Sequence, residues 1–496
     1  MSTNVSPKRV GPFPFPMSDP EKRSEDFSEV EQPYTLEQVQ EESKRCLLCG
    51  TPVCIDACPV QMDVRGMCDA VSRGDFGTAY KRIRDTNALI GVTARCCPQL
   101  QGLCEDACVM RWDGDPVSIG MIQRFVSDWE QFQSHQSFDE ESAAPSLKKV
   151  AVIGGGPSGL AASELLRRYG HSVTIYEELD KLGGTARYGI PDYHLPKDVL
   201  DYEIQAIKNL GVEAKTGVKV GKDVALTQLL SEVDAVLITT GPKDPLKLDT
   251  PGIDSKGVYD CYAFLEAVYG NGVDAYLKNP TYELGRTILV IGGGDSALDG
   301  ARTAKRLTGG RVSIIYRRTE KEMPADSIMV QEAREEGVEF VFLEDPAKYI
   351  AQDGKLSAVV MSTMQLGSPD QTGRRSPEPI PGKDQLVACD SVLLAVGRGP
   401  NSYLQLEEGI KTGKKNSIAV NDQFKTSMDR VFAAGDVVNG ETLVVKSMGS
   451  GREAAQRVHE FLMQIEDKHL SLYERYFVQR SFEQMQANQE GGLPPP

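Results

Sequence analysis

The segment at residues 148–178 reads KKVAVIGGGPSGLAASELLRRYGHSVTIYEE and predicts a β–α–β unit that binds a dinucleotide. An apolar strand runs into the pattern Gly154-x-Gly156-x-x-Gly159, a helix follows, and a second apolar strand ends at Glu177. The first glycine permits the tight turn, the second lets the backbone approach a pyrophosphate, and the third lets helix and strand pack closely. The acid at the end of the second strand is placed to accept hydrogen bonds from a ribose.

A second copy of this unit reads RTILVIGGGDSALDGARTAKRLTGGRVSIIYRR and contains the pattern Gly292-x-Gly294-x-x-Ala297. Its second strand ends at Arg317 and Arg318 instead of at an acid. Because an acid would repel a 2′-phosphate and an arginine can bind one, this copy predicts NADPH in preference to NADH. The alternative is that the two arginines form an ordinary solvated basic pair.

Two later stretches return to the first unit. A strand ends at Thr239–Gly241, and the stretch VFAAGDVVNG contains a strand followed by Gly435 and Asp436. Short apolar strands that alternate with helices are typical of parallel α/β sheets. The first nucleotide-binding domain is therefore predicted to be split, with the second domain inserted in it.

Nine of the eleven cysteines lie between residues 46 and 108, in two groups and one isolated position. The groups are CLLCGTPVCIDACP at residues 46–59 and CCPQLQGLCEDAC at residues 96–108. The spacing C-x2-C-x4-C-x3-C-P is typical of runs that bind iron–sulfur clusters, in which the last cysteine serves another cluster. Zinc is an alternative, although structural zinc favours two CxxC pairs or one CxxC with paired histidines. Disulfides are a third alternative, typical of small secreted chains.

The composition of the 496 residues, with 40% hydrophobic and 25% charged residues, is that of an ordinary soluble protein. The net charge of −16 argues against a nucleic-acid partner, because phosphate binding needs a positive surface. We expect no membrane span, since nowhere do 18 or more apolar residues run together. The many thiols and a start without an apolar signal stretch predict a reducing, cytoplasmic location.

Three segments lack the periodicity of helices or strands. Residues 1–32 are rich in proline, serine and charge, which predicts an extended arm or a segment that lies along another surface. Residues 136–149 are polar and small, as in a linker. The tail from about residue 467 ends in NQEGGLPPP, and we expect its last residues to be disordered.

Further motifs resemble one known family in kind and in order. They are LGG at 182–184, RYGIP at 187–191, LPK at 195–197, YRR at 316–318 and EMPA at 322–325. Over roughly residues 34–465 the chain is similar to the small subunit of bacterial glutamate synthase and its relatives. These relatives include the N-terminal half of dihydropyrimidine dehydrogenase and the large subunit of NADH-dependent ferredoxin:NADP oxidoreductase.

The resemblance implies an α/β fold in which a helical iron–sulfur domain precedes two Rossmann-like domains of the glutathione reductase type, the second inserted in the first. Residues 1–145 would bind two [4Fe–4S] clusters. Residues 146–283 and, with the tail, 399–496 would form the FAD-binding domain. Residues 284–398 would bind NADPH.

The resemblance also implies ligands. One cluster would take Cys46, Cys49, Cys54 and Cys108, and the other Cys58, Cys97, Cys104 and Gln123. Cys68 and Cys96 are left over, and the pair Cys97-Pro98 favours Cys97 over its neighbour. The implied cofactor-binding residues are Gly154, Gly156, Pro157, Ser158, Gly159, Glu177, Glu178, Gly184, Arg187, Thr240, Gly241, Gly435 and Asp436 around the first unit, Gly292, Gly294, Asp295, Ser296, Ala297, Arg317 and Arg318 around the second, and Gly397.

By this resemblance the chain is an oxidoreductase subunit that passes electrons between NADPH, FAD and two clusters to a partner. The expected partner is a large catalytic subunit like that of glutamate synthase, or a ferredoxin, and we expect an oligomer. The alternative is a self-contained or differently partnered NAD(P)H:ferredoxin or sulfide/polysulfide oxidoreductase. Flavin chemistry needs no general base or nucleophile from the protein, and the sequence offers no such set.

Overall fold

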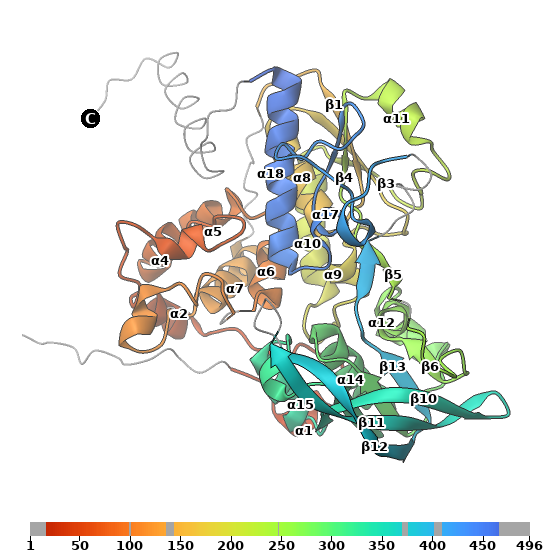
Figure 1. Cartoon of the computed structure of the whole chain (residues 1–496). Coiled ribbons are helices and arrows are strands. Elements are labelled where there is room, and N and C mark those ends of the chain that lie inside the picture. Colours follow the sequence, from red (N-terminus) through yellow and green to blue (C-terminus); the bar gives the residue numbers. More distant parts are fainter. Residues whose placement is uncertain are drawn as a thin grey trace, which may run out of the picture.

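The computed structural model describes residues 16–98, 101–134, 143–246, 248–369, 375–400 and 409–465. Figure 1 shows a group of N-terminal helices beside one α/β unit, with a second α/β unit below them. The start of the expected arm (1–15), the first half of the expected linker (136–142) and the expected tail from residue 467 lie outside the described residues. In these described ranges, no helix is both long and apolar enough to cross a membrane.

The N-terminal part consists of short helices that each bury one apolar face. On α4, for example, Met67 and Val71 are fully buried at helical spacing. Asp63 and Asp75 cap two of these helices by accepting hydrogen bonds from backbone N–H groups. The helices are α1 (Pro20–Arg23), α2 (Leu36–Ser43), α3 (Val53–Asp56), α4 (Val64–Ser72), α5 (Phe76–Arg84), α6 (Ile90–Cys96), η1 (Val109–Asp113), α7 (Ile119–Trp129) and η2 (Glu130–Ser134).

The first α/β unit is a parallel sheet in the order β15-β4-β1-β2-β3. Its central strand is buried on both faces, because Val150 and Val152 pack under α8 and α18 while Ala151 and Ile153 face the side covered by α11. The strands are β1 (Lys149–Ile153), β2 (Ser172–Tyr176), β3 (Glu213–Lys215), β4 (Ala235–Ile238) and β15 (Val431–Ala433). The helices are α8 (Pro157–Arg168), α9 (Thr185–Tyr188), α10 (Lys197–Asn209), α11 (Leu226–Glu232), α17 (Asp436–Asn439) and α18 (Val444–Met463).

The second α/β unit is a parallel sheet in the order β6-β13-β7-β8-β9. It has its own core, in which Phe264, Ile288 and Leu298 are completely buried. Its strands are β6 (Val258–Asp260), β7 (Thr287–Ile291), β8 (Arg311–Tyr316), β9 (Glu339–Phe342) and β13 (Ser391–Leu394), and its helices are α12 (Cys261–Tyr269), α13 (Val273–Lys278), α14 (Asp295–Thr308), η3 (Glu320–Glu322) and α15 (Ser327–Glu335). A three-stranded antiparallel sheet, β10 (Glu344–Gln352), β11 (Lys355–Pro369) and β12 (Arg375–Ala388), extends from this unit.

Two short antiparallel strands carry the chain between the α/β units. The chain leaves the first sheet after β4 through β5 (Pro242–Pro245) and returns through β14 (Arg398–Pro400), which pairs with β5, before η4 (Lys414–Asn416) and β15. The second unit is therefore inserted in the first, which confirms the predicted fold class. The inserted sheet includes β6, a strand that precedes residue 284, the predicted start of the insertion.

Candidate cofactor sites

A deep cavity lies over the first glycine loop, and we call it the first nucleotide cavity. Gly154 has a φ of +107°, and a Cβ atom there would lie 2.8 Å from the Thr239 carbonyl oxygen. A Cβ at Gly159 would lie 1.9 Å from the Gly154 carbonyl oxygen. The predicted residues that line this cavity are Gly154, Gly156, Pro157, Ser158, Glu177, Glu178, Gly184, Thr240, Gly241 and Asp436.

Gly156 differs from the other two glycines, because no neighbouring protein atom excludes a side chain at this position. A Cβ at this position would have Gly184 Cα at 3.8 Å as its nearest neighbour, which is ordinary contact. The space that a side chain would fill lies instead at the start of α8, where free N–H groups and the helix dipole attract a pyrophosphate. The residues present therefore fit a dinucleotide at this loop.

Two hydroxyl groups of the cavity wall also point to a missing ligand. The Ser158 Oγ and Thr240 Oγ1 atoms are buried, and neither has a hydrogen-bond partner within the described chain. A buried polar atom without a partner costs free energy, which a ligand with polar groups would recover. Both residues line the first nucleotide cavity.

Two of the predicted acids, Glu177 and Asp436, belong to the wall of this cavity. Glu177 accepts hydrogen bonds from Gly155 N at 2.7 Å and Leu179 N at 2.9 Å, which fixes its carboxylate beside the loop. Burial raises the pKa of Asp436 to about 6. Glu177 follows the end of β2, which is where an acid that binds a ribose lies in such folds.

Some predicted residues lie outside the wall of the first nucleotide cavity, and some residues of this wall were not predicted. Arg187 donates hydrogen bonds to the Leu182 carbonyl oxygen and to Asp201 instead. The predicted residues outside the wall are Gly159, Arg187, Gly397 and Gly435, and the missed residues within it include Tyr262, Arg398, Glu441 and Thr442. The Arg398 guanidinium lies 4.1 Å from the centre of the Tyr262 ring. The sole sequence signal for Arg398 as a cavity residue was its position directly after the predicted Gly397.

The second glycine loop repeats this geometry at the start of α14. Gly292 has a φ of +148°, and a Cβ there would lie 2.3 Å from the Ala395 carbonyl oxygen. Gly294 would again tolerate a Cβ, with Pro324 Cγ at 3.9 Å as its nearest neighbour. The Asp295 Oδ1 atom accepts a hydrogen bond from Asp326 N at 2.9 Å, which ties this loop to the start of α15. The fully buried Ala297 takes the place of the third glycine.

The two predicted arginines directly follow β8, at the carboxyl ends of the strands in the sheet that bears this loop. The ring of Tyr316 packs so closely over Gly293 that an added Cβ would lie 2.6 Å from it. Arg317, the next residue, is exposed, and Arg318 donates from Nε to the Arg375 carbonyl oxygen at 2.8 Å. Ligands of parallel α/β sheets bind outside the carboxyl ends of the strands, which is where these arginines lie.

A further cavity, the interdomain cavity, adjoins the first nucleotide cavity, with which it shares Thr185, Tyr262 and Glu441. Asp295 and Ser296 of the second glycine loop form another part of its wall. The wall is completed from the N-terminal half by Glu31, Arg95, Cys96, Cys97 and Pro98. The structure thus brings both predicted nucleotide sites and the N-terminal half together at one hollow.

The cysteines of the N-terminal half line two separate cavities. The outer cysteine cavity is lined by Cys46, Cys49, Cys54 and Cys108, together with Cys68. The inner cysteine cavity is lined by Cys58, Cys97, Cys104 and Gln123. Cys96 lies in the wall of the interdomain cavity instead.

Several of these thiols lie in surroundings that oppose their ionisation, whereas Cys46 does not. Burial raises the pKa of Cys54 to about 12 and also raises the pKa of Cys97 and Cys104. A hydrogen bond from Cys68 lowers the pKa of Cys46 to about 7. Since a bound metal centre deprotonates its thiol ligands outright, such a centre would stabilise the buried thiolates. Among the described residues, no three His, Cys, Asp or Glu side chains converge as ligands of a single metal ion would.

Gln123 and Glu105 bring oxygen atoms to the inner cysteine cavity. The Gln123 Nε2 atom donates hydrogen bonds to the Ile90 carbonyl oxygen and to Thr93 Oγ1, both at 2.7 Å. The amide nitrogen is therefore occupied, and the amide oxygen is the atom that suits iron. Glu105, which sequence reasoning missed, accepts a hydrogen bond from Gly120 N at 2.9 Å, and burial raises its pKa to about 8.

The first turn of α18 separates the inner cysteine cavity from the first nucleotide cavity. Val444 lines the first nucleotide cavity, and the next residue, Val445, lines the inner cysteine cavity. A Cβ at Gly449 would lie 2.5 Å from the Pro59 carbonyl oxygen, so the cysteine segment packs directly on this helix. One helical turn therefore links the two sites.

Comparison with known proteins identifies the class of the chain. Residues 148–451 match the family model described as pyridine nucleotide-disulphide oxidoreductase, and residues 23–135 match the model for dihydropyrimidine dehydrogenase domain II, 4Fe-4S cluster. The two matches imply FAD and NAD(P)H for the α/β half and a [4Fe–4S] cluster for the N-terminal half. The chain is thus an NAD(P)H-dependent flavin oxidoreductase with an iron–sulfur domain.

Two relatives narrow this class to a family. The chain is 33% identical to the glutamate synthase [NADPH] small chain of Halomonas elongata over 456 residues, covering 90% of this chain and 96% of the relative. It is 35% identical to the putative oxidoreductase AegA of Escherichia coli over 458 residues, covering 89% and 68%. The chain belongs to the glutamate synthase small-chain family of iron–sulfur flavin oxidoreductases, which confirms the predicted family.

A solved structure agrees with the fold of the α/β half. FprA of Mycobacterium tuberculosis in complex with NADPH has a TM-score of 0.53 and 18% sequence identity to this chain. The match covers 64% of this chain and 84% of FprA. It supports the two-domain fold described above.

Proposed function

We propose that this chain is an electron-input subunit that oxidises NADPH and passes the electrons through FAD and two [4Fe–4S] clusters to a partner protein. FAD, when bound, accepts a hydride from a nicotinamide and releases single electrons. The protein's task is to hold the groups in order and to exclude water from them. The observation that carries the proposal is the shared first turn of α18, where Val444 faces the first nucleotide cavity and Val445 the inner cysteine cavity.

Each cavity has residues suited to one of the groups. The Gly154 loop and Glu177 would hold the FAD pyrophosphate and ribose, and the Gly292 loop would hold the NADPH pyrophosphate at the start of α14. The interdomain cavity would take the nicotinamide, because it joins the second loop to the first nucleotide cavity. The outer cavity would hold one cluster with four cysteines, and the inner cavity the other, with three cysteines and the Gln123 oxygen.

We place the domain boundaries at the paired strands that join the units. The inserted nucleotide domain would run between β5 and β14, because β6 belongs to its sheet. The FAD-binding domain would comprise the chain from β1 to β5 and again from β14 to α18. The helical domain would hold both clusters, with its inner cavity against α18.

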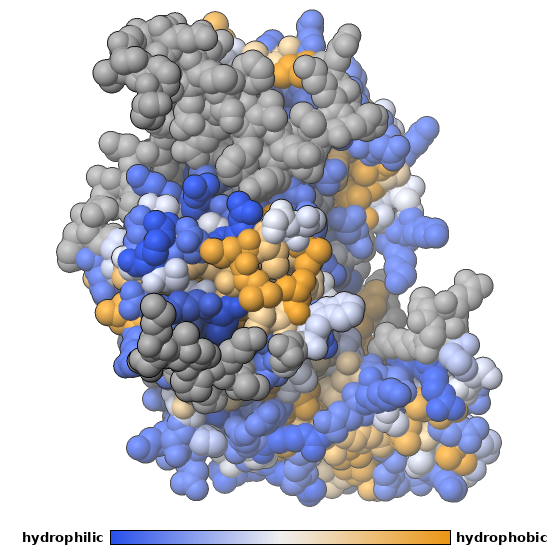
Figure 2. All heavy atoms as spheres, turned by 90° about the vertical axis from the view of Figure 1, so that its left-hand side faces the viewer, coloured by the Kyte–Doolittle hydropathy of each residue, from blue (hydrophilic) through white to orange (hydrophobic). Residues whose placement is uncertain are grey.

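The outer cysteine cavity marks the side on which a partner would receive electrons. Figure 2 shows an apolar area on the face formed by the N-terminal helices. Leu47 and Val53, which are 63% and 40% exposed, both belong to the wall of the outer cavity. Apolar surface of this kind suits contact with a protein. We assign the partner to the class of the glutamate synthase large subunit, because the relative from Halomonas elongata is a small chain of that enzyme.

The proposal is tested with the purified protein under anaerobic conditions. We expect about one FAD and eight irons per chain, the number that two four-iron clusters require. NADPH should bleach the flavin absorbance and generate the EPR signals of reduced clusters, without any added mediator. Stoichiometric zinc without acid-labile sulfide, or a flavin that NADPH does not reduce, would overturn the proposal.

Nucleotide choice should depend on Arg317 and Arg318. A charge-assisted hydrogen bond contributes roughly 1.5–3 kcal/mol, which is about ten- to a hundredfold in affinity. The double change to alanine should raise the KM for NADPH by that factor and leave the KM for NADH nearly unchanged. Steady-state rates with ferricyanide measure both constants without the native partner.

The matched control for this pair is the double change of Arg286 and Arg311 to alanine. These exposed residues lie at the amino ends of β7 and β8, on the other side of the sheet from the carboxyl ends of its strands. Their removal changes the net charge by the same amount as removal of Arg317 and Arg318. The control should leave both constants unchanged. Equal weakening of NADPH and NADH by the Arg317 and Arg318 change would show that these arginines do not bind the 2′-phosphate.

A further inference from the structure

The described part of the N-terminal arm, residues 16–32, forms a closed loop on the inserted nucleotide domain. Its two ends lie side by side, with Ser18 N donating to the Val30 carbonyl oxygen at 2.9 Å and Gln32 N to the Pro16 carbonyl oxygen at 2.8 Å. Figure 1 shows α1, at the tip of this loop, next to α14 and α15 and away from the other N-terminal helices. We call this loop the N-terminal clamp.

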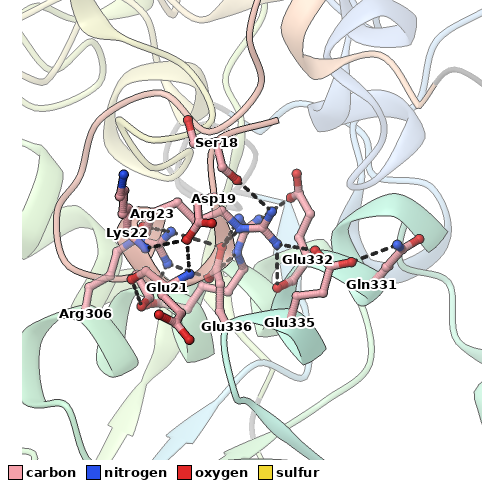
Figure 3. Close-up of polar contacts among 12 residues, drawn as sticks. Ser18, Asp19, Glu21, Lys22, Arg23, Arg306, Gln331, Glu332, Glu335 and Glu336 are labelled. Atoms are coloured by element: carbon pink, nitrogen blue, oxygen red, sulfur yellow. Dashed lines mark hydrogen bonds and ion pairs between the residues drawn. The ribbon is translucent and has the colours of Figure 1, made fainter. Parts of the chain in front are cut away.

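The tip of the clamp is anchored by Arg23, which is only 3% exposed. Figure 3 shows its guanidinium group among the carboxylates at the end of α15. It donates to Glu335 at 2.8 Å, to Glu336 at 3.1 Å and to the Glu332 carbonyl oxygen at 3.1 Å. A cation at the carboxyl end of a helix is favourable, because the helix dipole leaves negative charge there.

Helix α14 holds the other side of the clamp's tip. Arg306 donates to the carbonyl oxygens of Arg23 at 2.7 Å and Asp26 at 3.0 Å. The ring of Phe27 also contacts that of Tyr269 edge-on, with 6.3 Å between the ring centres. The clamp is therefore attached to α12, α14 and α15 of the nucleotide domain.

The base of the clamp is attached to the iron–sulfur helices. The Glu29 carboxylate accepts a hydrogen bond from Arg95 Nε at 2.6 Å and pairs with Arg124 Nη2 at 2.9 Å. Arg95 lies two residues before Cys97, and Arg124 directly follows Gln123, so both belong to the segments that line the inner cysteine cavity. The clamp thus connects this cavity with the nucleotide domain.

The FAD-binding domain supplies the third attachment through Tyr193. Its carbonyl oxygen accepts a hydrogen bond from Val30 N at 2.9 Å, and its ring lies under the guanidinium groups of Arg302 and Arg306, at 4.7 and 4.0 Å. The chain itself passes between the two α/β units through β5 and β14, and α9 of the first unit also packs against α12 of the second, where the Tyr262 hydroxyl donates to Thr185 Oγ1 at 3.5 Å. Two short strands form a hinge about which the nucleotide domain could rotate.

We propose that the N-terminal clamp fixes the nucleotide domain in the orientation that allows hydride transfer, with Arg23 as a positioning residue. The clamp holds the carboxyl halves of α14 and α15, whose opposite ends, at Asp295 and Asp326, line the interdomain cavity. A rigid helix transmits this position to the loop at its start. The inference rests on the proposed route from NADPH to FAD.

Substitution of Arg23 by alanine tests the clamp without leaving an unpaired buried charge. Glu336 keeps Arg302 and Arg306 as partners at 2.7 Å each, and the Glu335 side chain is 34% exposed and can be solvated. The fold should therefore survive this change, because an uncompensated buried charge is what makes such substitutions severe. Lys22 is the matched control, since it is an exposed cation on the same helix.

In stopped-flow experiments at saturating NADPH, Arg23→Ala should slow flavin reduction about ten- to a hundredfold, because small misplacements of reacting groups have effects of this size. Oxidation of the dithionite-reduced protein by ferricyanide should be unchanged, and Arg23→Lys should be intermediate. Lys22→Ala should match the wild type. An unchanged rate in Arg23→Ala would overturn the proposal.

Hydrogen–deuterium exchange of the protein without nucleotide provides a second measurement. Arg23→Ala should raise exchange in α15 and in the β5–β14 pair, while α4 and α5 exchange as in the wild type. A slower flavin reduction without any change in exchange at these elements would also overturn the clamp. If NADPH failed to reduce the wild-type flavin, the proposed function would fail, whereas the exchange measurement would still decide for or against the clamp.

Discussion

Replacement of Gly156 by alanine should abolish FAD binding while the protein remains folded and keeps its iron. The added methyl group has room within the protein, since its nearest neighbour would be Gly184 Cα at 3.8 Å. It would instead occupy the space in which a pyrophosphate approaches the start of α8. Flavin content, read from the absorbance after denaturation, should fall from about one per chain to a small fraction of that value.

The control is Gly50→Ala, at a glycine with no other atom within 4 Å of the added Cβ and far from this loop in sequence. It should keep its full flavin content. Iron analysis of Gly156→Ala should still give about eight atoms per chain, because the cysteine cavities belong to a separate helical part. Full flavin content in Gly156→Ala would show that no pyrophosphate approaches this loop closely.

Replacement of Cys54 by serine should remove the cluster of the outer cavity and no other group. The expected iron content falls from about eight to about four per chain, since one of two four-iron clusters is lost. The flavin should stay bound and should still be reduced by NADPH, because α18 and both nucleotide sites are untouched. Reduction of a protein acceptor should be lost, whereas ferricyanide reduction should persist.

Cys68→Ser is the matched control for this change. Cys68 lies in the same cavity wall as Cys54 and is more deeply buried, yet it is outside the predicted ligand set. This variant should retain eight irons and both EPR signals. Loss of a cluster in Cys68→Ser together with its retention in Cys54→Ser would show that Cys68, and not Cys54, is the cluster ligand.

Local patterns in the sequence determined the fold class and the family. The two glycine patterns predicted two β–α–β units, and the structure has them as β1–α8–β2 and β7–α14–β8. Such patterns are readable because the strand, the glycine turn, the helix and the next strand end all lie within about 30 residues of chain. The cysteine spacing likewise predicted the iron–sulfur half, which the family model for residues 23–135 supports. The individual ligands and cofactor contacts remain predictions.

Longer-range packing decided what the patterns left open. Nothing in the spacing distinguishes Cys97 from Cys96 beyond the following proline, but in the folded chain Cys97 lines the inner cysteine cavity, whereas Cys96 lines the interdomain cavity and neither cysteine cavity. Arg187 looked like a cofactor contact in sequence, yet its guanidinium is held by Asp201 on α10. Arg398 had no sequence signal beyond its position after Gly397, and Glu441 had none, although both line the first nucleotide cavity.

The kind of each unit and the chemistry suited to it can thus be predicted from the amino-acid sequence, because strand period, glycine turns and thiol spacing are local properties. How the units meet cannot be predicted in this way. The adjacent positions of Val444 and Val445 between two cavities, and the contact of Arg23 with residues more than 300 positions away, depend on packing between distant segments. Such contacts leave no periodic signal, since each is a single complementary pair whose partners only the folded chain brings together.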